Sequence, residues 1–131
     1  GRASFYRNFT DKEDVLRQEN ARLTAQWKRS YEAEERAAPN ELLISLLDFY
    51  KEHFDFYLAL YRAGLSDMLL QTLLEQSEIT PELPNALAYL KSSIAYMLYG
   101  WIVEWMKRGM PESGTELARM IADSQNTGTK P

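Results

Sequence analysis

The sequence predicts an all-α fold. Over long stretches, apolar residues recur three and four positions apart, which is the spacing of one face of an α-helix. Two capping boxes, Thr10-Asp-Lys-Glu13 and Ser113-Gly-Thr-Glu116, mark helix starts, because the Ser or Thr hydroxyl and the Glu satisfy exposed backbone N–H groups. Proline and glycine divide the chain into helix-length segments, and no segment shows the apolar–polar alternation of a half-buried strand.

Residues 1–16 predict the end of one helix, a tight turn and the start of a second helix at Thr10. This second helix continues to about Arg36. Its apolar positions are Val15, Leu16, Leu23 and Trp27. Pro39-Asn40 then breaks the chain, because proline lacks a backbone N–H group and asparagine is a good N-cap.

The rest of the chain predicts four more helices. A helix over 41–63 is apolar on more than half of its circumference, as expected of a helix that is covered on several sides. A shorter helix over 67–76 and a second long helix over 84–108 follow, separated by a proline-rich bend. The last helix spans 113–123. The longest nearly apolar run is far shorter than the ~20 residues of a membrane span, so we expect no membrane contact.

Composition limits the function classes. A chain of 131 residues with 45% apolar residues forms one domain, or one domain and part of another. It has no Cys, which excludes disulfides and thiolate metal sites and agrees with a reducing cytoplasm, where we expect the protein. Residues 1–36 hold eight Lys/Arg against seven Asp/Glu, and the remainder holds seven against twelve. Phosphate would repel this acidic remainder, so any DNA contact is expected at the N-terminal end.

The N-terminal segment has the residue types of a DNA-reading element. Basic and aromatic residues alternate there, and no acidic residue precedes Asp11. The run from Arg2 to Leu16 resembles the end of the DNA-binding domain of the tetracycline-repressor (TetR) family. In that family a recognition helix carries a Thr/Ser-aromatic-Tyr motif, here Ser4-Phe5-Tyr6, and Phe9, Lys12 and Leu16 match positions that follow it. Residues 99–113 also resemble the end of the ligand-and-dimer domain in one branch of the family.

The resemblance implies a domain organisation and a set of DNA contacts. Residues 1–16 match the C-terminal remnant of a helix-turn-helix domain, and residues 17–131 match an effector-binding and dimerisation domain. Earlier helices of the family's DNA-binding domain are absent from this sequence, so operator DNA is expected as a partner of the intact protein only. The matched phosphate-binding positions are Ser4, Tyr6 and Lys12, and the positions facing base edges or flanking backbone are Arg2, Ala3 and Arg7. Taken without the family, the same residues also fit an ordinary amphipathic helix end.

Aromatic residues crowd the two long predicted helices. They fit a core or an interface, and they also fit a pocket for an apolar or aromatic small-molecule effector, as the resemblance implies. The residues that we expect to line such a pocket are Phe54, Tyr57, Tyr61, Met68 and Tyr96. The last two helices carry more apolar surface than a small helical body needs, and in the family these helices form a homodimer. The expected interface residues are Trp101, Ile102, Trp105, Leu117, Met120 and Ile121, which in the alternative fill the monomer's own core.

No motif for catalysis or metal binding is present. His53 is the only histidine, and the nearby carboxylates Asp48, Glu52 and Asp55 fit a solvated charged face better than a metal site. No phosphate-binding loop or nucleophile elbow occurs, so we predict no catalytic residues, no metal and no cofactor. The sequence therefore predicts a DNA-binding transcriptional regulator. Repression of transcription is commoner than activation in the family that it resembles. The alternatives are a helical protein–protein interaction module without a small-molecule ligand, and a small helical enzyme or carrier.

Overall fold

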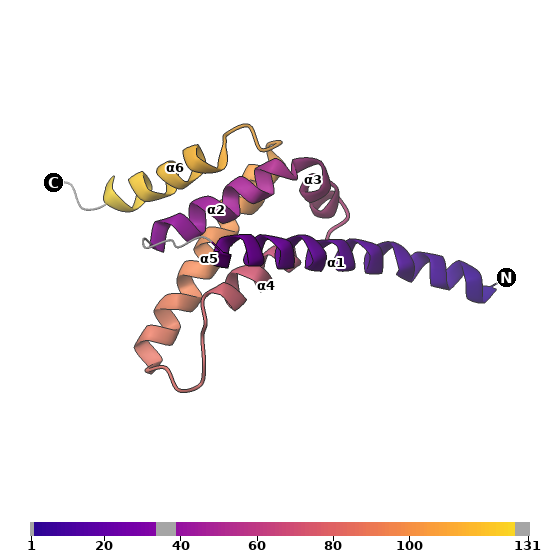
Figure 1. Cartoon of the computed structure of the whole chain (residues 1–131), viewed down its shortest axis with the longest axis horizontal. Coiled ribbons are helices and arrows are strands. Elements are labelled where there is room, and N and C mark those ends of the chain that lie inside the picture. Colours follow the sequence, from indigo (N-terminus) through magenta and orange to yellow (C-terminus); the bar gives the residue numbers. More distant parts are fainter. Residues whose placement is uncertain (1, 34–38, 128–131) are drawn as a thin grey trace.

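Six helices form the described part of the chain (Figure 1). The computed structural model describes the backbone of residues 2–33 and 39–127 and the side chains of residues 12–33 and 41–126. The helices are α1 (Arg2–Ala33), α2 (Pro39–Glu52), α3 (Phe54–Arg62), α4 (Asp67–Gln76), α5 (Asn85–Lys107) and α6 (Gly114–Thr127). No strand occurs in these ranges, so the predicted all-α class is confirmed. None of the helices found here is long and apolar enough to span a membrane.

The first helix is a single rod, and its N-terminal part extends beyond the other helices (Figure 1). The turn predicted just before Thr10 is therefore wrong. No glycine or proline lies between Arg2 and Ala33, so nothing in this segment forces the backbone out of the helix, and the capping box is overridden. Among the described side chains of α1, Asn20, Leu23 and Trp27 are buried, and Leu16 is partly buried. Val15 is 61% exposed, near the point where α1 leaves the body.

The helix predicted over 41–63 is divided in two at His53. The backbone N–H of His53 still donates to the Phe49 carbonyl at 3.1 Å, and the His53 carbonyl accepts from Tyr57 at 3.1 Å. The His53 Nδ1 atom also lies 3.1 Å from the Phe49 carbonyl oxygen. A side chain that competes for a carbonyl of the helix ladder is a known cause of bending, and it explains the change of direction between α2 and α3.

The start of α6 docks closely on α2. The Asp48 carboxylate accepts from the Thr115 backbone N–H at 3.1 Å and from its hydroxyl at 3.4 Å. The Ser113 hydroxyl accepts from the Glu116 N–H at 3.0 Å, which is half of the predicted capping box. Gly114 leaves no room for a side chain, because an added Cβ would lie 2.3 Å from the Asp48 backbone nitrogen. The α5–α6 connection is further held by Trp105, whose indole N–H donates to the Glu112 carbonyl at 3.2 Å.

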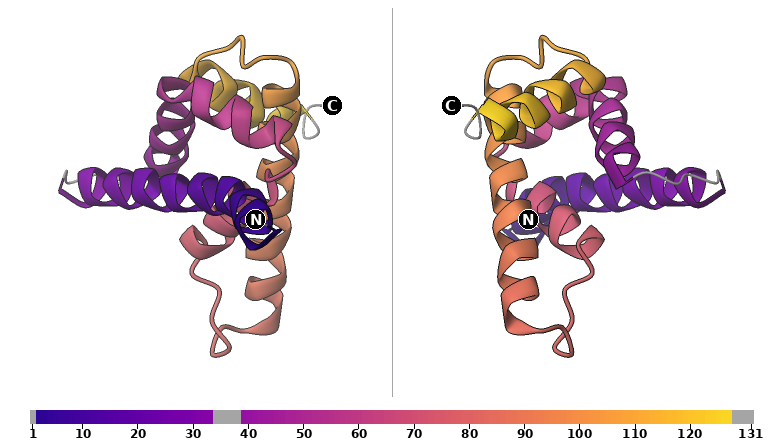
Figure 2. Two further views of the ribbon diagram at one scale, coloured as in Figure 1. Left: turned by 90° about the vertical axis from the view of Figure 1, so that its right-hand side faces the viewer. Right: turned by 90° about the vertical axis from the view of Figure 1, so that its left-hand side faces the viewer.

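The main core lies where α2, α3, α4, α5 and α6 meet, and Leu23 and Trp27 of α1 pack into it. Its fully buried side chains are Leu47, Tyr50, Tyr57, Leu69, Ile102, Met106 and Met110, and Leu60 is fully buried in a smaller cluster with Leu65 and Met68. The N-terminal half of α5 and the connection over 77–84 project away from α2 and α6 (Figure 2). They are tied to each other by Lys91, whose ammonium donates to the Ser77 carbonyl at 3.1 Å.

We predict that Gly114→Ala lowers the free energy of unfolding by about 1–3 kcal/mol, because the new methyl group overlaps backbone atoms of α2. Urea unfolding followed by circular dichroism measures the change. Gly100→Ala is the matched control, since a Cβ at Gly100 meets no atom within 4 Å and alanine favours a helix. An equal loss in both variants would contradict the close α2–α6 approach.

Candidate functional site

The residues predicted to contact DNA lie on the projecting end of α1. The side chains of Arg2, Ala3, Ser4, Tyr6 and Arg7 lie outside the described part of the structure, while their backbone is helical. Lys12 is exposed. The boundary predicted between residues 16 and 17 falls inside α1, so one continuous helix joins the predicted DNA-contacting segment to the core, and the boundary itself stays a prediction.

Of the residues predicted to line an effector pocket, Met68 lines the groove between α1 and α4 that is described below, and the other four line none of the three grooves described here. Phe54 and Tyr96 are 43% and 55% exposed, and Tyr61 is partly buried at the edge of the core. Tyr57 and Met68 are buried, and they approach each other through a third residue that the sequence analysis missed. That residue is Asn20 of α1.

Asn20 forms the centre of a buried polar contact between α1, α3 and α4. The Tyr57 hydroxyl donates to Asn20 Oδ1 at 2.9 Å, and Asn20 Nδ2 donates to the Met68 sulfur at 3.9 Å. Asn20 is one of two buried polar residues among the described side chains, apart from the tyrosines. Its position three residues before Leu23, on the buried face of α1, is the signal that sequence reasoning could have used, because a polar residue within an apolar stripe needs a partner.

Two more hydroxyl groups lie close to this contact. The Tyr50 hydroxyl is fully buried, and it forms no hydrogen bond of good geometry with the described residues, although the Thr72 hydroxyl lies close enough to interact with it. Burial raises the pKa of Tyr50 far above its usual value, and the nearby Thr72 hydroxyl opposes this only in part. The rings of Tyr50 and Tyr57 meet edge to face at 4.6 Å, and burial also raises the pKa of Tyr57. We call Asn20, Tyr50, Tyr57 and Thr72 the buried polar cluster.

A groove of about 380 Å³ between α1 and α4 opens at the buried polar cluster. Asn20 and Thr72 belong to both the cluster and the groove. The residues that line the groove are Arg17, Asn20, Ala21, Thr24, Ala25, Lys28, Met68, Gln71, Thr72 and Glu75. Lys28 and Glu75 form an ion pair of 3.6 Å that bridges the two helices, so the charged groups stand at the exposed rim of the groove.

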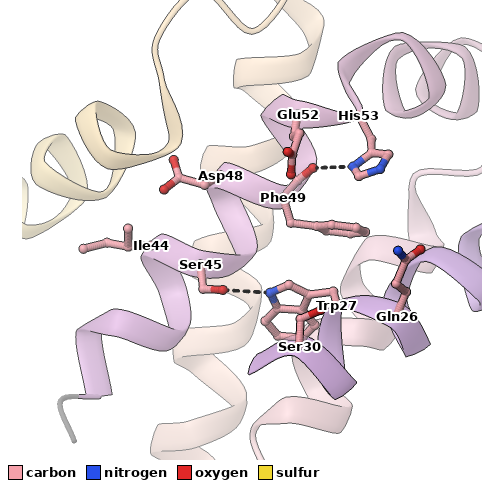
Figure 3. A pocket seen from close by; sticks show the side chains of 9 residues that line it. All are labelled: Gln26, Trp27, Ser30, Ile44, Ser45, Asp48, Phe49, Glu52 and His53. Carbon is pink, nitrogen blue, oxygen red and sulfur yellow. Dashed lines mark hydrogen bonds between the residues drawn. The ribbon is translucent and has the colours of Figure 1, made fainter. Parts of the chain in front are cut away.

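A second groove, of about 310 Å³, lies between α1 and α2 (Figure 3). Several of its polar side chains have partners within the fold. The Trp27 indole N–H donates to the Ser45 hydroxyl at 2.9 Å, His53 turns to the Phe49 carbonyl, and Asp48 points towards α6. Among the described side chains, no group of three His, Asp or Glu residues could hold a metal ion.

The residues predicted for the dimer interface divide between core and surface. Ile102, Trp105, Leu117 and Ile121 are buried within the chain's own core. Trp101 is partly buried, and Met120 is 45% exposed. These two border a third groove, of about 600 Å³, between α5 and α6. Exposed apolar residues continue from it along α5 at helical spacing. They are Leu87, Leu90 and Ile94.

The family comparison identifies this domain. Residues 38–127, which include α2 to α6 and most of the chain, match the family model of a transcriptional regulator C-terminal region. The domain is thus the C-terminal region of a transcriptional regulator. The matching model is that of TetR-type regulators, and the chain belongs to the TetR family, which confirms the resemblance seen in the sequence. No curated protein and no solved structure matches the chain.

Proposed function

We propose that the intact protein is a DNA-binding, non-catalytic regulator that acts as a homodimer and responds to an effector bound by its helical domain. The observation that carries this proposal is α1. This 32-residue helix contains the predicted DNA-contacting residues at one end and Asn20 of the buried polar cluster further along. Because an α-helix is stiff over this length, a change at Asn20 moves the N-terminal end of the helix.

Operator contacts fall on the N-terminal segment. Ser4, Tyr6 and Lys12 hold phosphates, which fixes the register of the protein on DNA. Arg2, Ala3 and Arg7 lie against base edges or the flanking backbone, and an arginine can bind guanine through two hydrogen bonds. The charge distribution supports this placement, since the rest of the chain carries seven basic against twelve acidic residues.

The α5–α6 surface is the proposed dimer interface. It combines the apolar stripe of Leu87, Leu90 and Ile94 with the groove bordered by Trp101 and Met120. Exposed apolar surface of this extent is typical of protein–protein contact sites, and a second copy would cover both features. A two-fold dimer would place two recognition helices in successive major grooves, about 34 Å apart.

Regulation follows from the geometry of α1. An effector that binds the domain in only one orientation of α1 changes the separation of the two recognition helices in the dimer. The resulting coupling between effector and DNA is typically ~1–3 kcal/mol. We propose that effector binding releases the protein from DNA and that the protein is therefore a repressor of transcription.

We predict that Arg7→Ala in the intact protein weakens binding to DNA from upstream of its own gene by about tenfold or more, because a bidentate base contact is lost. Fluorescence anisotropy at a fixed salt concentration measures the affinity. Arg119→Ala, an exposed arginine on α6, is the matched control and should bind as the wild type does. Equal affinity of all three proteins would remove Arg7 from the operator contacts, and no preference for this DNA over random DNA would oppose the regulator proposal.

We predict that Ile94→Asp weakens the dimer by at least about tenfold, because a carboxylate would be buried in the apolar stripe. Sedimentation velocity over a range of protein concentrations measures the dimer dissociation constant. Tyr89→Asp is the matched control, since Tyr89 is exposed on another face of α5 and should leave the dimer intact. A wild-type protein that stays monomeric throughout would favour the alternative, an interaction module that uses this surface for a different polypeptide.

A further inference from the structure

The two helices that form the proposed dimer surface pack on different neighbours. Within the described ranges, the backbone of α6 lies closest to α2, whereas the backbone of α5 lies closest to α4 and α3 (Figure 1). α5 and α6 make few close backbone contacts with each other, and the groove of about 600 Å³ lies between them. The shape of the proposed dimer surface therefore depends on how α2 is fixed relative to α5.

Two charged side chains of α2, which lie one helical turn apart, hold the connection between α5 and α6. The Asp48 carboxylate accepts from the Thr115 backbone N–H at 3.1 Å, at the start of α6. The Lys51 ammonium donates to the carbonyl of Met110, which follows the end of α5. Each charge has the sign that the nearby helix end favours, because free N–H groups make a helix N-terminus positive and free carbonyls make a C-terminus negative.

Met110 joins α5 to α2 through its backbone. Its N–H donates to the Trp105 carbonyl of α5 at 2.8 Å, and its carbonyl accepts from Lys51 of α2. The residue has a φ of +55°, which side chains other than glycine rarely adopt, and its side chain is fully buried. A residue in this conformation persists only where the surrounding contacts hold it. The position of the connection is therefore set by specific contacts.

We propose that Asp48 and Lys51 are positioning residues for self-association, which set the separation of α5 and α6 and thereby the shape of the surface that a second copy covers. Neither side chain borders the α5–α6 groove, so both act on the second copy only through the helices that they hold. Hydrogen bonds are directional and fix the orientation of a helix, whereas packed helices can slide past each other. The inference rests on the proposed dimer for its functional consequence.

The second copy must fit both sides of the groove at once. Trp101 borders the groove on α5, and Met120 borders it on α6. A change in the separation of the two helices moves these side chains apart or together, so that one rigid partner surface no longer contacts both. Loss of the Lys51 contact therefore weakens the dimer without changing any residue of its surface.

Sedimentation velocity of the full chain measures the effect on self-association. We expect Lys51→Met, which keeps the alkyl chain and removes the donor, to weaken the dimer about fivefold or more, the lower end of a typical coupling between two sites. Lys51→Arg keeps a donor and should restore most of the affinity. Lys28→Met is the matched control, since Lys28 joins α1 to α4 through Glu75 and does not hold α6. An unchanged dissociation constant in Lys51→Met, or an equal loss in Lys28→Met, would overturn the proposal.

Urea unfolding shows whether each variant is folded under the conditions of the dimer measurement. If Lys51→Met does not fold, Asp48→Ala provides the same test at the other end of the connection, because it removes both hydrogen bonds to Thr115. We expect the same direction of change in the dimer dissociation constant. A folded Asp48→Ala variant with the affinity of the wild type would overturn the proposal.

Spin labels measure the separation of α5 and α6 within one chain. The labels replace the exposed residues Tyr96 on α5 and Arg119 on α6, and the labelled chains are diluted with an excess of unlabelled ones. We expect Lys51→Met to shift or broaden the distance distribution from double electron–electron resonance, and Lys28→Met to leave it unchanged. An unchanged distribution in Lys51→Met would overturn the proposal. A monomeric wild type with a shifted distribution in Lys51→Met would remove the proposed dimer and keep the role of Lys51 in placing α6.

Discussion

The hydrogen bond from the Tyr57 hydroxyl to Asn20 fixes the middle of α1 on the rest of the domain. The bond is buried, where the low dielectric strengthens a polar contact and makes its loss destabilising. Towards the C-terminal end of α1, Leu23 and Trp27 add apolar burial. Towards the N-terminal end, α1 leaves the body. Eighteen residues separate Asn20 from Arg2, which is about 27 Å of helix at 1.5 Å per residue, so a small rotation at Asn20 becomes a larger displacement at the predicted DNA contacts.

The same helices hold the buried polar cluster, the α1–α4 groove and the apolar α5–α6 surface. α4 forms one wall of the α1–α4 groove and packs against α5, whose exposed stripe forms the proposed dimer interface. α5 is in turn joined to α6 by the connection that Trp105 and Asp48 help to hold. A change at the groove therefore has a continuous path of packed helices to the α5–α6 surface.

Local signals predicted most of the helices and fewer of the site residues. Proline, glycine and capping residues predicted the observed bounds of α4 and nearly those of α5. No local signal predicts the break at His53, because this break depends on the contact of the His53 side chain with the Phe49 carbonyl. Tyr57 and its neighbour Met68 were predicted for a pocket, whereas Asn20 was missed because its partners come from two other helices. Apolar periodicity also could not separate core from interface. It predicted Ile102, Trp105, Leu117 and Ile121 for a dimer interface, with the monomer's own core as the alternative, and the structure of the single chain buries these four side chains.

A double-mutant cycle with Asn20→Ala and Tyr57→Phe tests most directly whether this hydrogen bond holds α1 on the domain. Urea unfolding of the wild type, the two single variants and the double variant gives the coupling free energy. The account predicts a coupling of about 1 kcal/mol or more, because each single variant leaves a buried polar group without its partner. Effects that add within about 0.3–0.5 kcal/mol would show that the two residues act independently, and α1 would then be held by apolar packing alone.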